Sequence, residues 1–214
     1  SLNKYIIKCC LIKEQLIMVE GFNPVRYSII KGKCPREIVM LVCMISFAVI
    51  GRVIFYMTPQ VKPCAAIIII TGIALGKKAG FLTGAMTAFV SNFFMGQGPW
   101  TPWQMVAFGL LGYIFGIAYS KRNVGSYIPK KQKNFICFMG MLATIVVYGV
   151  IMDTATVLMS TDSPSVQAFI TAYTAGFIMN VIHGISTFIF LWFMLIPMLK
   201  KIDRVNIKYG MYVK

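Results

Sequence analysis

The sequence predicts an all-α polytopic membrane protein with six transmembrane helices and both termini in the cytoplasm. Hydrophobic residues make up 58% of the 214 positions and charged residues only 13%, which is too apolar for an ordinary soluble domain. Apolar runs recur along the chain at about the length of a spanning helix. The basic residues gather on one side of the alternating connections that these runs define.

The six apolar runs lie at 37–57, 63–76, 79–95, 103–120, 135–159 and 168–199. Most approach the roughly 20 residues that a spanning helix needs. The second run is short and could instead form half of a re-entrant hairpin with the third. That arrangement would bury Lys77 and Lys78 at the bilayer centre, at about 2.5–3.5 kcal/mol each on insertion scales. Six spans are therefore predicted.

The formal net charge is +15, and the basic residues that cause it lie almost entirely on one side of the predicted membrane. With the N-terminus inside, the inner segments hold every lysine and arginine except Arg52, in the first span, and Lys62, in an outer loop. This asymmetry obeys the positive-inside rule and predicts a multi-pass membrane protein with both termini in the cytoplasm. The same sorting argues against a nucleic-acid partner.

Three regions follow from this topology. They are a basic N-terminal extension over 1–36, a six-helix membrane domain over 37–199 and a basic cytoplasmic tail over 200–214. The apolar residues of the extension fall at roughly helical spacing among lysines, which fits a helix on the inner membrane surface. A basic extension without fixed structure fits the composition equally well. A signal peptide is not predicted, because charges interrupt any apolar core.

The sequence carries no motif of a common catalytic site. It has no phosphate-binding loop, no His-Glu-x-x-His and no nucleophile elbow, and its six acidic residues and one histidine leave little for acid–base chemistry. The cysteines form no Cys-x-x-Cys pair, so no metal site and no external disulfide are expected. We predict a protein that is not an enzyme and needs no cofactor. If it moves a substrate uphill, the energy must come from a partner or from an ion gradient.

Polar residues near the outer ends of the spans are candidates for ligand binding. Arg52 lies in the first span, Asn92 ends the third, and Asp153 lies in the outer half of the fifth. Ionisable groups in a membrane usually face a cavity or each other, so Arg52 and Asp153 form either a structural ion pair or part of a polar cavity. Asn92 either supports helix packing or offers an amide to a polar organic ligand.

The connection Phe93–Gln104 is aromatic and stiffened by two prolines. Gln97 stands between two glycines, which favours contact with a ligand. The segment Thr101–Gln104 predicts a helix start, with threonine as the cap, proline next, and glutamine closing a capping box. Trp100 and Trp103 form either an interfacial aromatic belt or a stacking surface for a planar ligand.

The sixth span carries the single histidine. Asn180 and His183 lie three residues apart on one face, and Tyr173 lies near the outer start. A lone histidine in a helix bundle is usually a hydrogen-bonded packing residue, although it could also form the floor of a cavity. Tyr173 is either a belt residue or a cavity wall.

Small residues recur at four-residue spacing and let membrane helices approach closely. They either pack within the bundle or dock on another membrane subunit. The residues are Gly72, Gly76, Gly80, Gly84, Ala88, Gly112 and Gly116.

Several of these segments resemble the substrate-binding S component of energy-coupling-factor (ECF) transporters. The likeness covers about residues 37–199 and rests on Gly51–Phe55, the Lys62-Pro63 turn, Gly72–Gly76 and, most specifically, Gly96–Gln104. It implies six helices that bind a vitamin near the outer face. It also implies partners, namely a transmembrane coupling subunit and two cytosolic ATPases, and release of the cargo by toppling in the membrane.

The resemblance extends to the coupling contact and the ligand. The first helix of such proteins often carries Ala-x-x-x-Ala against the coupling subunit; here Ala48 and Gly51 are the candidates within a looser set of small residues. Within the family, the chain is most similar to S components for cobalamin or related corrinoids. The composition of the loop would also suit a flavin or a pterin.

We therefore predict a vitamin-binding subunit of a bacterial ECF importer that captures its ligand without making or breaking a bond. The alternative is a self-sufficient, proton- or ion-coupled carrier that uses Asp153 and His183. The predicted binding residues are Arg52, Asn92, Gln97, Trp100, Trp103, Gln104, Asp153, Tyr173 and His183.

Overall fold

The computed structural model describes residues 35–119, 129–160 and 164–208. Every element in these ranges is helical, which confirms the all-α part of the predicted fold class. Residues 36–214 form a compact unit of their own, and the predicted N-terminal extension lies almost entirely outside the described residues. The elements are α3 (Pro35–Ile54), α4 (Cys64–Leu75), α5 (Lys77–Met95), α6 (Thr101–Tyr119), α7 (Lys130–Ala143), the π-helical turn η1 (Thr144–Tyr148), α8 (Gly149–Ser160) and α9 (Val166–Lys208).

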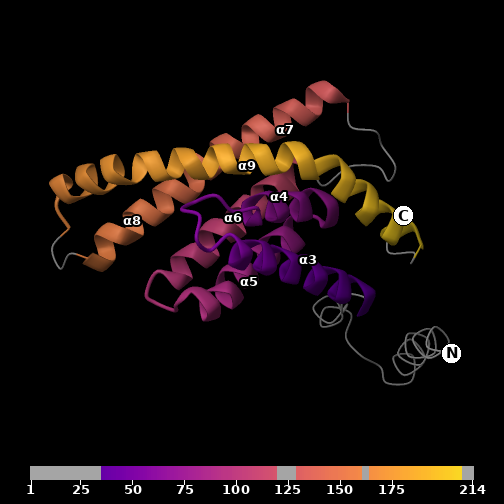
Figure 1. Ribbon diagram of the computed structural model, residues 1–214, viewed down its shortest axis with the longest axis horizontal. Coiled ribbons are helices and arrows are strands. Elements are labelled where there is room, and N and C mark those ends of the chain that lie inside the picture. Colours follow the sequence, from indigo (N-terminus) through magenta and orange to yellow (C-terminus); the bar gives the residue numbers. More distant parts are fainter. Residues whose placement is uncertain (1–34, 120–128, 161–163, 209–214) are drawn as a thin grey trace, which may run out of the picture. The chain divides into compact units, whose positions relative to one another are not determined.

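Each predicted run corresponds to one helical segment, with α7, η1 and α8 continuous over 130–160. α3, α5 and α8 end on the side where α4, α6 and α9 begin (Figure 1). Among the described residues, four segments are long and apolar enough to cross a membrane, namely 37–54, 101–119, 130–160 and 166–208. α4 is apolar but has only 12 residues. α5 has 19 residues but begins with two lysines, and it is not among the segments that meet both the length and the hydropathy requirement.

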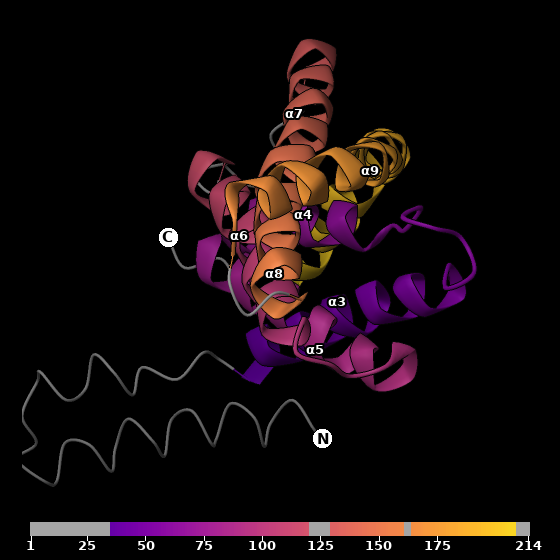
Figure 2. The same cartoon turned by 90° about the vertical axis from the view of Figure 1, so that its left-hand side faces the viewer.

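α4 lies at the centre of the bundle (Figure 2). Every residue from Cys64 to Ile73 is buried, and α5, α6 and α9 all pack against this helix. A helix covered on all sides needs no polar face, which explains the run of isoleucines at 67–70. Gly76 alone joins α4 to α5, at a φ of 89° that glycine tolerates best. Lys77 and Lys78 are exposed at this turn, so the hairpin does not bury them within the protein.

Glycines bring the backbone of α5 into direct contact with α6. A Cβ on Gly80 would collide with the carbonyl of Gly112, and one on Gly84 would collide with the carbonyl of Phe108. A Cβ on Gly72 of α4 would also meet Gly112. The four-residue ladder is therefore a packing interface inside the bundle, which is the first of the two interpretations open from the sequence.

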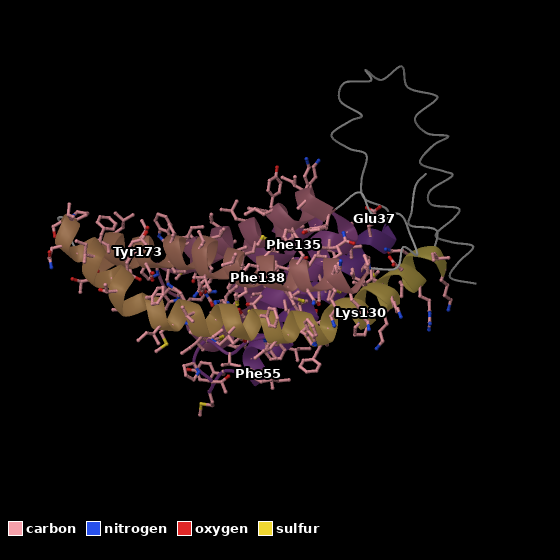
Figure 3. The ribbon with its side chains drawn as sticks, turned by 90° about the horizontal axis from the view of Figure 1, so that it is seen from above. Glu37, Phe55, Lys130, Phe135, Phe138 and Tyr173 are labelled. Carbon is pink, nitrogen blue, oxygen red and sulfur yellow. The ribbon has the colours of Figure 1, made fainter. Side chains whose placement is uncertain are left out.

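The two ends of the bundle differ in the side chains that they present. Figure 3 shows Tyr173 toward one end of the α8–α9 pair and Lys130 and Glu37 toward the other. Between these ends, large apolar side chains such as Phe177 and Phe193 are exposed. Apolar flanks between polar ends are what a bilayer requires of a helix bundle.

The backbone contact between α5 and α6 predicts a strong effect of one methyl group. Gly84→Ala should lower the free energy of unfolding by about 1–3 kcal/mol, because its Cβ meets the rigid carbonyl of Phe108. Gly140→Ala is the matched control, since its Cβ meets the flexible end of Leu191. Alanine's higher helix propensity affects both variants alike. Thermal unfolding in detergent, followed by tryptophan fluorescence, should show the larger loss for Gly84→Ala; equal losses would contradict the packing described.

Candidate functional site

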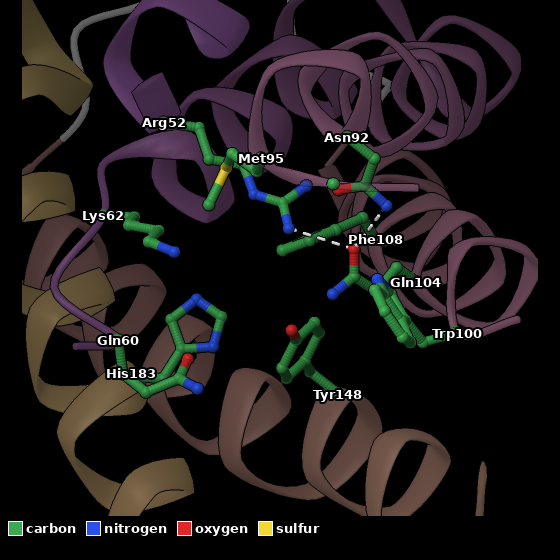
Figure 4. A pocket seen from close by; sticks show the side chains of 11 residues that line it. Arg52, Gln60, Lys62, Asn92, Met95, Trp100, Gln104, Phe108, Tyr148 and His183 are labelled. Atoms are coloured by element: carbon green, nitrogen blue, oxygen red, sulfur yellow. Dashed lines mark hydrogen bonds between the residues drawn. The ribbon is translucent and has the colours of Figure 1, made fainter. Parts of the chain in front are cut away.

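A cavity of about 150 Å³ lies at the end of the bundle where α3 and α5 end and α6 begins (Figure 4). Five of the nine predicted binding residues line it, from α3, α5, the following loop, α6 and α9. Its walls are formed by Arg52, Gln60, Lys62, Asn92, Met95, Gly96, Trp100, Gln104, Phe108, Tyr148 and His183.

Arg52 is the centre of a hydrogen-bond network in this cavity. Its side chain is only 4% exposed. Nη1 donates to Ser91 Oγ at 2.7 Å and Nη2 to Gln104 Oε1 at 3.0 Å. Gln104 Oε1 also accepts from Asn92 Nδ2 at 3.1 Å (Figure 4). Asn92 Nδ2 donates as well to Thr101 Oγ1 at 3.0 Å. The network ties α3 to α5 and α6 and holds the guanidinium at the cavity wall.

The predicted capping box at the start of α6 is not formed. α6 does begin at Thr101, as expected. The side chain of Gln104, however, bonds Arg52 and Asn92 instead of turning back to the helix start. Buried charged donors are more costly to leave unpaired than a helix-terminal N–H, so the amide oxygen serves them.

His183 packs edge-on against aromatic rings at the cavity. Its ring centroid lies 4.7 Å from that of Tyr148 and 6.1 Å from that of Phe108. His183 Nδ1 is buried and has no hydrogen-bond partner, and the same holds for Arg52 Nε. Buried polar atoms in proteins are nearly always bonded, so two such atoms around one cavity indicate partners that a ligand or water would supply. Of the two interpretations of His183, its place in the wall favours the cavity.

A π-helical turn positions Tyr148. η1 widens the helix between α7 and α8, and the Thr144 hydroxyl donates to the Gly140 carbonyl at 2.8 Å. Isolated π-turns inside α-helices occur frequently at functional sites. Sequence analysis did not identify Tyr148 because such a turn leaves no residue pattern to recognise.

Lys62 is the second cation of the cavity, and sequence analysis noted it only as an outer-loop lysine. Its backbone N–H donates to Ser186 Oγ at 3.1 Å, which fixes the loop against α9. Its side chain is half-buried, and burial together with the positive charge of Arg52 lowers the pKa of Lys62 below its ordinary value of 10.5. None of the residues that line the cavity is acidic, so the site is electropositive.

Four predicted residues do not line the cavity, and three of them, Gln97, Asp153 and Tyr173, make hydrogen bonds within the fold. Gln97 donates to the Phe89 carbonyl at 3.2 Å and accepts from Thr101 Oγ1 at 2.9 Å, and so holds the loop. Trp103 is 37% exposed on the outside of α6. Asp153 Oδ2 accepts from Asn180 Nδ2 at 2.8 Å across α8 and α9. Both members of the possible Arg52–Asp153 ion pair therefore have other partners.

Tyr173 belongs to the same α8–α9 contact. Its hydroxyl shares a hydrogen bond of 2.9 Å with Thr154 Oγ1 and reaches the Val150 carbonyl at 3.4 Å. It is not among the lining residues of the cavity. Tyr173 therefore does not form part of the cavity wall, and it is more than an interfacial belt residue, because its hydroxyl links α9 to α8.

A family model decides the identity of the chain. The model of the ECF-type riboflavin transporter S component matches residues 35–198. The chain belongs to this family. Comparisons with curated proteins and with solved structures gave no match. The resemblance to an ECF S component is thus confirmed, and the S component is a transporter subunit and not an enzyme. The family is of the riboflavin type, so the match gives no support to the cobalamin branch.

The hydrogen-bond network makes one amide oxygen critical for stability. Gln104→Met keeps the length of the side chain but removes the acceptor shared by Arg52 and Asn92. Leaving these donors unpaired should cost about 1–3 kcal/mol of unfolding free energy. Gln97→Met is the control, because water can replace the bonds of its exposed side chain. Thermal unfolding should separate the two S-component variants clearly; indistinguishable melting temperatures would show that the network does not carry this role.

Proposed function

We propose that this S component captures riboflavin or a closely related flavin at the outer face of a bacterial cell membrane. It delivers the ligand inward together with a transmembrane coupling subunit and two cytosolic ATPases. The observation that carries the proposal is the cavity, which joins aromatic surfaces to hydrogen-bonding groups at one end of the bundle. The family match supports the flavin as the first ligand to test.

The cavity contains the types of group that a flavin ring requires. Phe108, Tyr148 and Trp100 offer aromatic surface to a planar ring system. Arg52 and Asn92 offer N–H donors to ring carbonyls, and amides also pair with ring N–H groups. Sites of this kind combine mostly apolar walls with a few placed polar groups. We therefore replace the corrinoid suggested by the sequence with a flavin.

The size of the cavity adds a requirement. Its volume of about 150 Å³ is below the roughly 300–1,000 Å³ of typical small-molecule sites. A flavin enters whole only if part of the wall moves outward. The loops that carry Gln60 and Lys62, and Gly96 and Trp100, supply that part, because they are not locked in helix packing. A corrinoid, which is several times larger than a flavin, would require a much greater opening.

The membrane orientation is part of the same proposal. We place six spans in the bilayer, including α4 and α5, which length and hydropathy together do not identify as spans. The positive-inside rule puts Lys77, Lys130 and the end of α9 in the cytoplasm. The cavity then opens outward, where an importer meets its ligand.

One tryptophan should matter for the ligand and its neighbour should not. Trp100 lines the cavity, whereas Trp103 does not, although both are about equally exposed. Trp100→Ala should weaken riboflavin binding about tenfold through lost ring contact, and Trp103→Ala should leave it within about twofold. Riboflavin fluorescence quenching on purified protein in nanodiscs measures both. Equal losses, or no riboflavin binding by the wild-type protein, would contradict the proposed site or the proposed ligand respectively.

The energy source separates the importer from the ion-coupled carrier. Vesicles that contain this chain alone should not accumulate riboflavin under an imposed proton gradient. Vesicles that also contain the coupling subunit and ATPases should accumulate it when ATP is inside. Asp153, which the carrier would need, bonds Asn180 and does not line the cavity, so Asp153→Asn should leave ATP-driven uptake within about twofold. Accumulation by the chain alone would overturn the importer.

A further inference from the structure

Two of the residues that line the cavity are positively charged and none is acidic. Arg52 lies on α3, and Lys62 lies in the loop that follows it. Each contributes to the positive potential at the other, since the charge of Arg52 lowers the pKa of Lys62. The other titratable groups around them are Cys64 at the start of α4, Tyr148 in η1 and His183 on α9, none of which is negative when neutral. Asp153 of α8 acts electrostatically on Tyr148 from outside the lining, where it accepts a hydrogen bond from Asn180.

Two like charges in a partly buried cavity are unfavourable unless something compensates them. Burial removes part of the water that stabilises each cation, and the low dielectric strengthens the repulsion between the two charges. Surrounding dipoles compensate only part of this: Ser91 and Gln104 each accept one bond from Arg52. Arg52 Nε remains buried without a partner. Proteins usually place paired charges in such positions, so the missing partner is expected to come from outside the chain.

We propose that Arg52 and Lys62 form an anion-binding pair, and that the ligand carries a negatively charged group, such as a phosphate, between them. The inference rests on the proposed function and narrows its substrate class from flavins in general to acidic flavins. A neutral ring carbonyl would accept one hydrogen bond but leave both charges uncompensated. An oxyanion would satisfy the donors and the charges together, and charge-assisted bonds are about twice as strong as neutral ones.

The pair also predicts how binding depends on pH. Lys62 is charged below its pKa, and that pKa is lower than the ordinary 10.5 in the free protein. As the pH rises through this lowered value, Lys62 loses its charge and the site loses half of its positive charge. Preference for the anion should therefore fall, as the pH rises, at a lower pH than the ordinary pKa of lysine would predict.

The first experiment compares two ligands with the same ring. Binding of riboflavin and riboflavin 5′-phosphate is measured by flavin fluorescence with the wild-type chain in phosphatidylcholine nanodiscs. The phosphate should bind about tenfold or more tightly, and 0.5 M NaCl should reduce this preference. Lys62→Gln should abolish most of the preference, because it should weaken binding of the phosphate far more than binding of riboflavin. Lys78→Gln, at the exposed α4–α5 turn, is the matched control and should change neither value.

A second measurement does not depend on flavin binding. Inorganic pyrophosphate should raise the melting temperature of the wild-type protein relative to NaCl at equal ionic strength, and should not do so for Lys62→Gln. Arg52→Lys is used in place of Arg52→Gln, because loss of the buried charge could unfold the protein. Arg52→Lys keeps the charge and should retain part of the rise in melting temperature with pyrophosphate. Repeating the assay with phosphatidylglycerol in the nanodisc tests a lipid headgroup as the source of the anion, because that lipid would then suppress the effect of pyrophosphate.

The outcomes separate the two proposals. If riboflavin binds as tightly as its phosphate and Lys62→Gln changes neither, the anion pair is wrong while the flavin importer stands. If no flavin binds but pyrophosphate stabilises the protein through Lys62, the anion pair stands and the flavin is wrong. If pyrophosphate has the same effect on the wild type, Lys62→Gln and Lys78→Gln, the ion acts elsewhere and the proposal fails.

Discussion

Backbone contact between α5 and α6 is the constraint on which the site depends. Gly80 and Gly84 let α5 approach carbonyl groups of α6 more closely than any side chain would allow. At the end of the same pair that carries the cavity, this spacing brings Asn92 Nδ2 of α5 within 3.1 Å of Gln104 Oε1 of α6. Membrane helices gain little from burial of apolar surface, so such close packing supplies much of their association. The polar wall of the cavity therefore depends on the glycine contacts farther along the same pair of helices.

Arg52 turns that wall into a charged site. An arginine inside a bundle is expensive, and it is tolerated here because Ser91 and Gln104 accept hydrogen bonds from both Nη atoms. These bonds orient the guanidinium without neutralising it, since both acceptors are uncharged. A carboxylate in either position would have made a closed structural ion pair. The choice of neutral acceptors keeps the charge available at the cavity.

The fold followed from the sequence more completely than the site did. Length and hydrophobicity of the apolar runs predicted all six helical segments, because these are local properties of the chain. Of the predicted residues that line the cavity, Arg52, Asn92 and His183 were chosen as polar groups inside a membrane bundle, and Trp100 and Gln104 from the stiff aromatic loop. Asp153, chosen like Arg52, bonds Asn180 and does not line the cavity, because its surroundings are set by how α8 and α9 pair. Tyr148 and Lys62 depend on a π-turn and a loop contact, and no local pattern encodes either.

The cavity wall is divided between rigid and movable parts. Asn92, Gln104 and Phe108 stand on helices fixed by glycine contacts and by the buried α4, so they cannot move apart without unpacking the bundle. Tyr148 and His183 stand on η1 and α9, and the rest of the wall is formed by loops, one of which is bonded through the Lys62 N–H to Ser186. For the proposed ligand, which is larger than the cavity, we therefore expect the loops to move while the helices stay in place. In the proposed importer, reopening the site for release would need energy from the ATPase partners, so capture and energy use would fall to different subunits.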